Sequence, residues 1–140
     1  MKILLINGPN INMLEKREIE FYGSFSLSEI EERLIKEFPK DEFTFFQSNF
    51  EGAIIEKIQE ASDTFQGMVI NPGAYSHYSL AIKDALGICK IPKVEVHLSN
   101  ISAREPLRQQ MLTAQNCDGC IFGFKENVYI LGVKALKIIV

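Results

Sequence analysis

Residues 2–10 read Lys-Ile-Leu-Leu-Ile-Asn-Gly-Pro-Asn, and this stretch decides the fold. Its first part, residues 2–6, is a short and almost continuous apolar run, which is typical of a strand buried on both faces. Its second part, residues 7–10, consists of turn-forming residues that end the strand. Because a strand buried on both faces needs a layer of helices on each side, the stretch predicts an α/β fold.

Short apolar runs alternate with segments of helical spacing along the rest of the chain. The pattern predicts five strands, at residues 2–6, 43–47, 67–71, 93–97 and 120–124. It also predicts helices that begin at Ser26, span residues 51–62, contain Leu80, Ala81 and Leu86, begin near Arg104 and span residues 128–139. The expected fold is therefore a flavodoxin-like, doubly wound, five-stranded parallel sheet with helices on both faces. No linker or repeat interrupts residues 1–140, which we expect to form a single domain.

The composition limits the classes of partner. The 140 residues are 46% hydrophobic and 24% charged, within the range of soluble globular proteins. A net charge of −3 and no run of basic residues argue against a nucleic-acid partner. No apolar run is long enough for a membrane span or a signal peptide, and the three cysteines are an odd number. We therefore expect a cytoplasmic protein with reduced thiols and no membrane partner.

Polar side chains follow three of the predicted strands. In doubly wound sheets ligands bind beyond the carboxyl ends of the strands, so residues 7–23, 71–77 and 95–100 are expected to share one edge of the sheet. Both histidines of the chain, His77 and His97, lie in these segments. Taken singly, such residues are more often turn or structural residues. Their coincidence at one edge predicts a catalytic site.

Several cofactor chemistries are disfavoured by what the sequence lacks. Gly8 has no second and third glycine around it, so the nucleotide-binding fingerprint is absent and a flavin carrier is disfavoured. No tight spacing such as His-x-x-x-His supports a metal site. Cys117 and Cys120 have the spacing of a redox pair, but they precede a predicted strand instead of opening a helix. We expect no cofactor and no metal.

The remaining residues suit acid–base chemistry. A free tyrosine titrates near pH 10 and is a poor base at neutrality, but a guanidinium beside it favours the phenolate. Arg17 and Tyr22, on a predicted loop, are therefore a candidate base. His97 with Glu95 suits a proton donor, and Asn10 could hold a water or an oxyanion. Arg104 and Arg108 supply donors for an anionic or polyhydroxylated substrate.

Along essentially its whole length the chain resembles the type II 3-dehydroquinate dehydratases. The matching stretches are Ile-Asn-Gly-Pro-Asn-Ile-Asn-Met-Leu at 6–14, Arg-Glu at 17–18, Tyr-Gly at 22–23, Phe-Phe-Gln-Ser-Asn-Phe-Glu-Gly at 45–52, Asn-Pro-Gly-Ala-Tyr-Ser-His at 71–77, Glu-Val-His-Leu-Ser-Asn-Ile at 95–101 and Ala-Arg-Glu at 103–105. The resemblance implies an anti elimination of water from 3-dehydroquinate through an enolate, giving 3-dehydroshikimate for aromatic amino acid biosynthesis. It also implies a homododecamer built from trimers, with no metal and no covalent imine.

The resemblance also implies roles for individual residues. Tyr22, aided by Arg17, would take the proton beside the ketone, and Asn10 would stabilise the enolate through a water. His97, held by Glu95, would protonate the departing hydroxyl. The implied substrate-binding residues are Asn71, Leu98 and Ser99 for the carboxylate, His77 and Arg108 for the ring hydroxyls, Asp84 from a neighbouring subunit, and Arg104 in support.

The chain departs from the family's pattern at Glu15, Ile19, Tyr78 and residues 106–113. The first two could alter loop motion, the third could crowd the site, and the last could alter subunit packing. Two alternatives stay open: a flavodoxin-like binding module without turnover, and a lyase for a related hydroxy-ketone acid. A biosynthetic and a catabolic role would use the same reaction.

Overall fold

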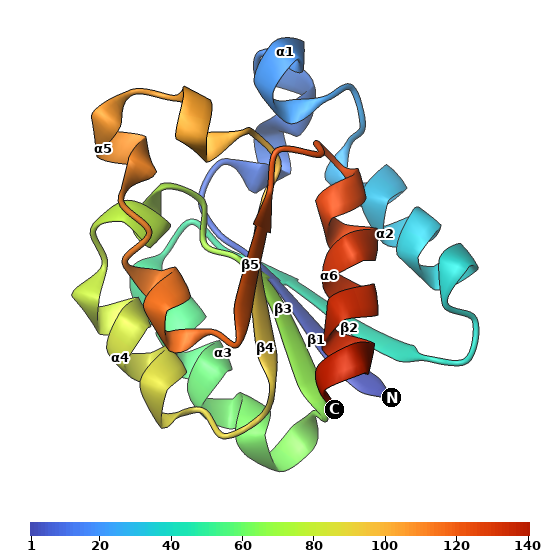
Figure 1. The fold of residues 1–140 in the computed structure, drawn as a ribbon. Helices are drawn as coiled ribbons and strands as arrows, with labels where there is room; N and C mark the ends of the chain where they lie inside the picture. Colours follow the sequence, from blue (N-terminus) through green and yellow to red (C-terminus); the bar gives the residue numbers. More distant parts are fainter.

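The computed structural model describes residues 1–140, and its centre is a five-stranded sheet in the order β2-β1-β3-β4-β5 with every neighbouring pair parallel (Figure 1). The strands are β1 (Lys2–Asn7), β2 (Glu42–Gln47), β3 (Gly67–Asn71), β4 (Lys93–His97) and β5 (Gly119–Phe122). This order is that of flavodoxin-like sheets, and it reverses between β1 and β3. The predicted fold class is confirmed.

Helices cover both faces of the sheet (Figure 1). One face packs against α2 (Leu27–Glu37) and α6 (Asn127–Ile139), and the other against α3 (Glu51–Thr64) and α4 (Leu80–Ile88). Side chains alternate between the two cores along β1: Ile3 and Leu5 join the first core, and Leu4 and Ile6 join the second. This alternation follows from the two-residue period of a strand, and it explains why residues 2–6 are apolar throughout.

The last strand ends two residues earlier than the sequence predicts. We expected strand structure at residues 120–124, but β5 ends at Phe122. Gly123 has φ of 94° and Lys125 has φ of 50°, and both values take the chain out of extended geometry. The Gly123 and Lys125 amides donate to the carbonyls of His97 and Leu98, at 3.2 and 2.9 Å. The turn is therefore tied to the end of β4.

Short helical segments gather at the carboxyl ends of the strands, at the top of Figure 1. They are η1 (Ile11–Lys16), α1 (Ile19–Tyr22), η2 (Gly73–His77), η3 (Ile101–Ala103) and α5 (Pro106–Gln109), whereas η4 (Thr113–Asn116) lies lower in the picture, beside α4 and before β5. The predicted loop at residues 15–23 consists largely of two such turns. Pro106 occupies the first turn of α5, where its missing N–H is harmless. No helix in the chain combines the length and apolar character needed to cross a membrane.

The turns after β1 and β3 touch each other. The Gly8 amide donates to the Asn71 carbonyl at 2.8 Å, and a Cβ at position 8 would lie 2.3 Å from the Pro72 carbonyl oxygen. A larger residue at position 8 would therefore push the two strand ends apart. Glycine at this position brings the polar residues after β1 and β3 together.

Candidate active site

A buried carboxylate lies in the middle of β4. The Glu95 side chain is 0% exposed. Ser76 Oγ donates to Glu95 Oε1 at 2.6 Å, and Thr113 Oγ1 donates to Oε2 at 2.6 Å. His97 Nε2 lies 2.7 Å from Oε1, and it must carry the proton because a carboxylate only accepts. Three donors, Ser76, Thr113 and His97, thus compensate the buried charge of Glu95. The bond to Glu95 also fixes the orientation of the His97 ring and leaves its Nδ1 for another partner.

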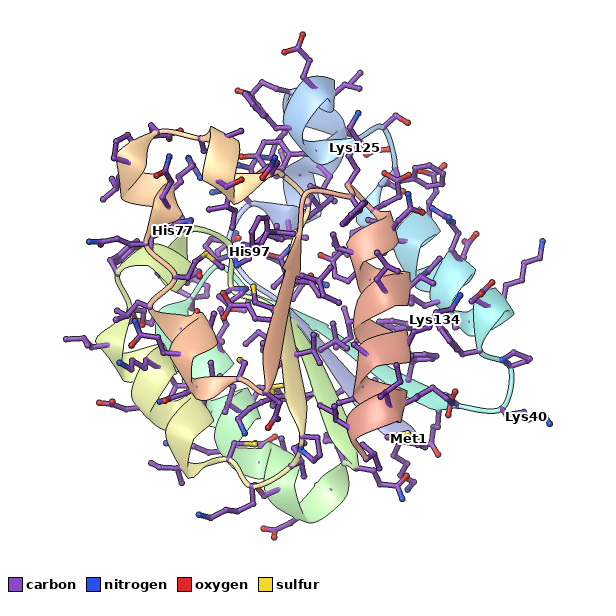
Figure 2. The ribbon with its side chains drawn as sticks, in the orientation of Figure 1. Met1, Lys40, His77, His97, Lys125 and Lys134 are labelled. Atoms are coloured by element: carbon purple, nitrogen blue, oxygen red, sulfur yellow. The ribbon has the colours of Figure 1, made fainter.

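The two predicted histidines lie beside each other. Their rings are 6.0 Å apart between centroids and inclined by 26°, and both appear at the carboxyl end of the sheet in Figure 2. His77 Nδ1 donates to the Gln110 carbonyl at 2.7 Å, so neutral His77 offers Nε2 as an acceptor. Burial lowers the pKa of His77 below its ordinary 6.5. A neutral imidazole that can accept from a hydroxyl therefore lies next to the His97 ring.

The Tyr22 hydroxyl is held by two guanidinium groups. Arg17 Nη2 donates to it at 2.5 Å and Arg104 Nη1 at 3.2 Å. The Arg17 guanidinium carbon also lies 3.7 Å from the centre of the Tyr22 ring. Tyr22 is only 7% exposed, so the two charges act on the oxygen with little screening by water. Two cationic side chains therefore donate to one phenol oxygen.

Arg104 has a larger part in this geometry than the sequence indicates. Besides Tyr22, its Nη1 donates to Ser99 Oγ at 3.1 Å, and its guanidinium lies 4.1 Å from the centre of the Phe21 ring. It therefore links the end of β4 to α1. Tyr22 and Arg104 are 82 positions apart in the sequence. Neither local spacing nor periodicity could have revealed this contact.

An amide network lies on the opposite face of the sheet. The hydroxyl of Tyr129, from α6, donates to Asn7 Oδ1 at 2.6 Å and accepts from Asn71 Nδ2 at 2.9 Å. The Gly73 amide donates to Asn71 Oδ1 at 3.1 Å, which fixes the orientation of that side-chain amide. Asn71 Nδ2 keeps a second hydrogen, and Asn7 Nδ2 is buried without a hydrogen-bond partner. Asn71 was predicted as a site residue, whereas Tyr129 was missed.

Other predicted residues lie around this edge or away from it. Asn10 is exposed with a left-handed backbone (φ 67°), and its amide donates to Asn49 Oδ1 at 3.1 Å. Leu98 and Ser99 are buried directly after β4. Arg108 Nε donates to Glu105 Oε1 at 2.6 Å. Asp84 lies on the exposed side of α4, among no ion pair of the chain.

Tyr78 borders the site. Its side chain is 61% exposed and packs edge to face against Tyr75, with 5.7 Å between the ring centroids. A cavity of about 100 Å³ is lined by Tyr78 together with His77, Arg108 and Leu107. Tyr78 thus contributes to the entrance beside the two residues predicted to bind hydroxyls.

The cysteines form no disulfide. All three are free, and burial raises the pKa of Cys120 to about 12 and the pKa of Cys117 higher still. Reactive redox cysteines have lowered pKa values, so these raised values agree with incidental thiols. Together with Glu95 and His97, however, Cys120 offers three possible metal-ligand atoms within 4.8 Å of one another.

A family model described as dehydroquinase class II matches residues 1–137. The chain belongs to this family. The 3-dehydroquinate dehydratase of Clostridium beijerinckii is 50% identical over 141 residues, covering 99% of this chain and 97% of that protein. That of Thermotoga neapolitana is 48% identical over 140 residues, covering 98% and 94%. The family resemblance predicted from the sequence is confirmed.

Solved class II dehydroquinases have the same fold. The type II dehydroquinase from Butyrivibrio crossotus superposes with a TM-score of 0.94 at 45% identity, covering 98% of this chain and 97% of that chain. The one from Propionibacterium acnes gives a TM-score of 0.90 at 36% identity, covering 99% and 94%. This dehydroquinase chain brings together Tyr22, Arg17 and Arg104 in one group, and Glu95, His97 and His77 in another.

Proposed function

We propose that the chain is a type II 3-dehydroquinate dehydratase, which eliminates water from 3-dehydroquinate to give 3-dehydroshikimate on the route to aromatic amino acids. The observation that carries the proposal is the Tyr22 hydroxyl held by Arg17 and Arg104, at 2.5 and 3.2 Å. A phenol in this setting is a base, and His97 bound to Glu95 is its matching acid. Membership of the dehydroquinase class II family identifies 3-dehydroquinate as the substrate.

The first step is removal of a proton from the carbon beside the ketone. The Tyr22 phenolate takes this proton, the C–H electron pair moves toward the ketone, and an enolate forms. The exposed Asn10 side chain holds a water that donates to the enolate oxygen. Fixed donors aimed at developing charge lower the barrier most where water is otherwise excluded.

The second step is loss of the hydroxyl group. With Nε2–H bonded to Glu95, a protonated His97 carries its second proton on Nδ1. The enolate re-forms the ketone, the C–O bond breaks, and the hydroxyl leaves as water with the Nδ1 proton. The Glu95 charge stabilises the imidazolium that this step requires. The proton on Tyr22 then returns to His97 through solvent, which restores both groups.

The substrate is held by groups on both faces of the sheet. The free hydrogen on Asn71 Nδ2 and the backbone amides of Leu98 and Ser99 bind the carboxylate. His77 Nε2 accepts from one ring hydroxyl, and Arg108 donates to another, exchanging its present bond to Glu105. Arg104 supports Tyr22 and Ser99.

We also propose that residues 1–140 act as a single catalytic domain in a cytoplasmic homododecamer of trimers. Asp84 supports the assembly because it is exposed on α4 and takes part in no ion pair of its own chain, which leaves its carboxylate available to a neighbouring subunit. Sedimentation equilibrium should give a mass twelve times that of the 15.9 kDa chain. Asp84→Asn should raise KM while the mass stays the same, and a monomeric active enzyme would overturn this assembly.

The test of the function is ultraviolet absorbance of the protein mixed with 3-dehydroquinate and a chelator, which follows the conjugated enone of the product. We expect a rising signal that Tyr22→Phe reduces by about 10²–10⁴-fold, the range of acid–base catalysis. A flat trace from the folded wild type would overturn the dehydratase. A melting shift with flavin or nucleotide would then favour the binding module.

A further inference from the structure

Three potential metal-ligand side chains share one face of the sheet beside the proposed proton donor. Glu95 and His97 are two positions apart on β4, so they point to the same face. Cys120 on β5 is the register partner of Glu95, so its side chain lies on that face too. The carboxylate oxygen, the imidazole nitrogen and the sulfur lie within 4.8 Å of one another. The backbone of two paired strands therefore holds the set in place.

The ligand set fits Zn²⁺. Zinc binds carboxylate oxygen, imidazole nitrogen and thiolate sulfur at about 2.0–2.3 Å, which places the ligand atoms of a tetrahedral site roughly 3.3–3.8 Å apart. To bind the ion, the 2.7 Å distance between His97 Nε2 and Glu95 Oε1 must lengthen slightly. The largest separation within the set of three ligand atoms, which is at most 4.8 Å, must shorten. Three protein ligands leave a fourth position for water, as in open zinc sites.

Neighbouring groups would orient such a site. Ser76 Oγ and Thr113 Oγ1 each donate to a Glu95 oxygen at 2.6 Å, and this kind of outer contact positions metal-binding carboxylates. On binding, the Cys120 S–H proton leaves to solvent, the His97–Glu95 hydrogen bond breaks, and the His97 proton moves from Nε2 to Nδ1, which frees Nε2 for the metal. Two anionic ligands, the Glu95 carboxylate and the Cys120 thiolate, then balance the charge of the ion. The site, which carries the Glu95 charge without the ion, thus becomes neutral overall.

We propose that Glu95, His97 and Cys120 form an inhibitory Zn²⁺ site, with Cys120 as the residue that makes it bind tightly. The inhibition rests on the proposed function, because the ion would occupy His97, which protonates the departing hydroxyl, and Glu95, which holds His97 in place. The metal has no part in the dehydration itself. Cys120 shares no hydrogen bond with Glu95 or His97, whose donors and acceptors are already paired with one another and with Ser76 and Thr113, so a replacement of similar size leaves those bonds in place.

Direct binding is tested with Co²⁺, whose thiolate complexes absorb in the near ultraviolet. We expect wild-type protein to develop a sulfur-to-cobalt band that Zn²⁺ displaces. Cys120→Val should lose the band and weaken Zn²⁺ binding by more than the roughly 10–100-fold that loss of an outer contact costs. Cys117→Ala, three residues away, is the matched control and should keep both. Cys120→Ser repeats the test if the valine variant folds poorly.

Turnover provides the second readout. Zn²⁺ should inhibit the wild type and Cys117→Ala, EDTA should restore their activity, and Cys120→Val should resist the ion while retaining its basal rate. Equal inhibition of Cys120→Val, or no cobalt–sulfur band in an active wild type, would overturn the site. A cobalt–sulfur band in a folded protein without dehydratase activity would support the site and overturn the proposed function instead.

Discussion

The two halves of the proposed site are built differently. The acid half, Glu95 and His97, lies on a strand inside the sheet, and its carboxylate is fully buried with three hydrogen-bond donors. The base half, Arg17 and Tyr22, lies outside the sheet on short helical turns. Folding itself therefore sets the geometry of the acid, whereas a few side-chain contacts set that of the base. Substitutions in the acid half should lower stability and activity together, and those in the base half mainly activity.

The largest effect is expected for Arg17→Met. Removing the closer guanidinium disfavours the Tyr22 phenolate, so kcat at neutral pH should fall by about 10²–10³-fold, within the range of acid–base catalysis. The residual rate should rise with pH, and the unfolding free energy should change by no more than about 0.5 kcal/mol. Arg33→Met, which removes an arginine 4.8 Å from the centre of the Phe25 ring, is the matched control. A large loss of stability in Arg17→Met would erase the contrast between the halves.

Glu95→Gln should lower stability and activity at once. The amide has nearly the same shape, but its NH₂ group faces hydrogen-bond donors from Ser76, Thr113 or His97, and at least one buried group loses its partner. The unfolding free energy should fall by about 1–3 kcal/mol, and kcat by about 10²-fold. Urea unfolding and the absorbance assay, applied to one preparation, measure both. A variant with normal stability and low kcat would place the acid half in the same class as the base half.

A smaller effect is expected from the donors behind Glu95. Thr113→Val removes the donor to Oε2, the oxygen that His97 does not contact, and should cost about 1–2 kcal/mol of stability with less than about a tenfold loss of kcat. Ser76→Ala removes the donor to Oε1, which His97 shares. It should cost similar stability and more kcat. Equal kcat values for the two variants would contradict a specific role for Oε1.

The smallest effect concerns protonation of His77. Because burial lowers its pKa below 6.5, the folded protein binds this proton less readily than the unfolded chain does. The contribution of His77 to stability is therefore complete above the unfolded pKa and falls as the pH drops through about 6.5. Imidazole NMR signals followed against pH, with His77→Gln to assign them, should show one titration below 6.5. A titration of the His77 signal above pH 6.5 would refute the proposal that neutral His77 accepts a hydrogen bond from the substrate.

Much of the site was predictable because, in a doubly wound sheet, the order of strands along the sequence shows which segments follow their carboxyl ends. Continuous apolar runs located the strands, and the strand-end rule brought His77 and His97 to one edge although they are 20 positions apart. The pairing of Arg17 with Tyr22 was predictable from their closeness along the chain. Both contacts are present in the structure.

The rest depends on contacts that no local pattern encodes. Ser76 and Thr113 come from separate turns and meet only at the Glu95 carboxylate. The end of β5 was missed because the backbone amide of Lys125, a residue with positive φ, donates a hydrogen bond to the Leu98 carbonyl. This is a tertiary contact. The hydrogen bond from Arg104 to Tyr22 was missed as well, because it is also a tertiary contact. Within one chain, Asp84 is simply an exposed residue of α4.

The Tyr129 hydroxyl, which joins Asn7 to Asn71, has a consequence for biosynthesis of the protein. A ribosome makes β1 and β3 long before α6, so both asparagines are present before the side chain that connects them. Their amides stay unjoined until α6 packs against the sheet. The strands can thus pair during translation while the proposed carboxylate-binding edge is still unfinished. The side chains of Asn7 and Asn71 therefore gain their shared hydrogen-bond partner only with the final helix.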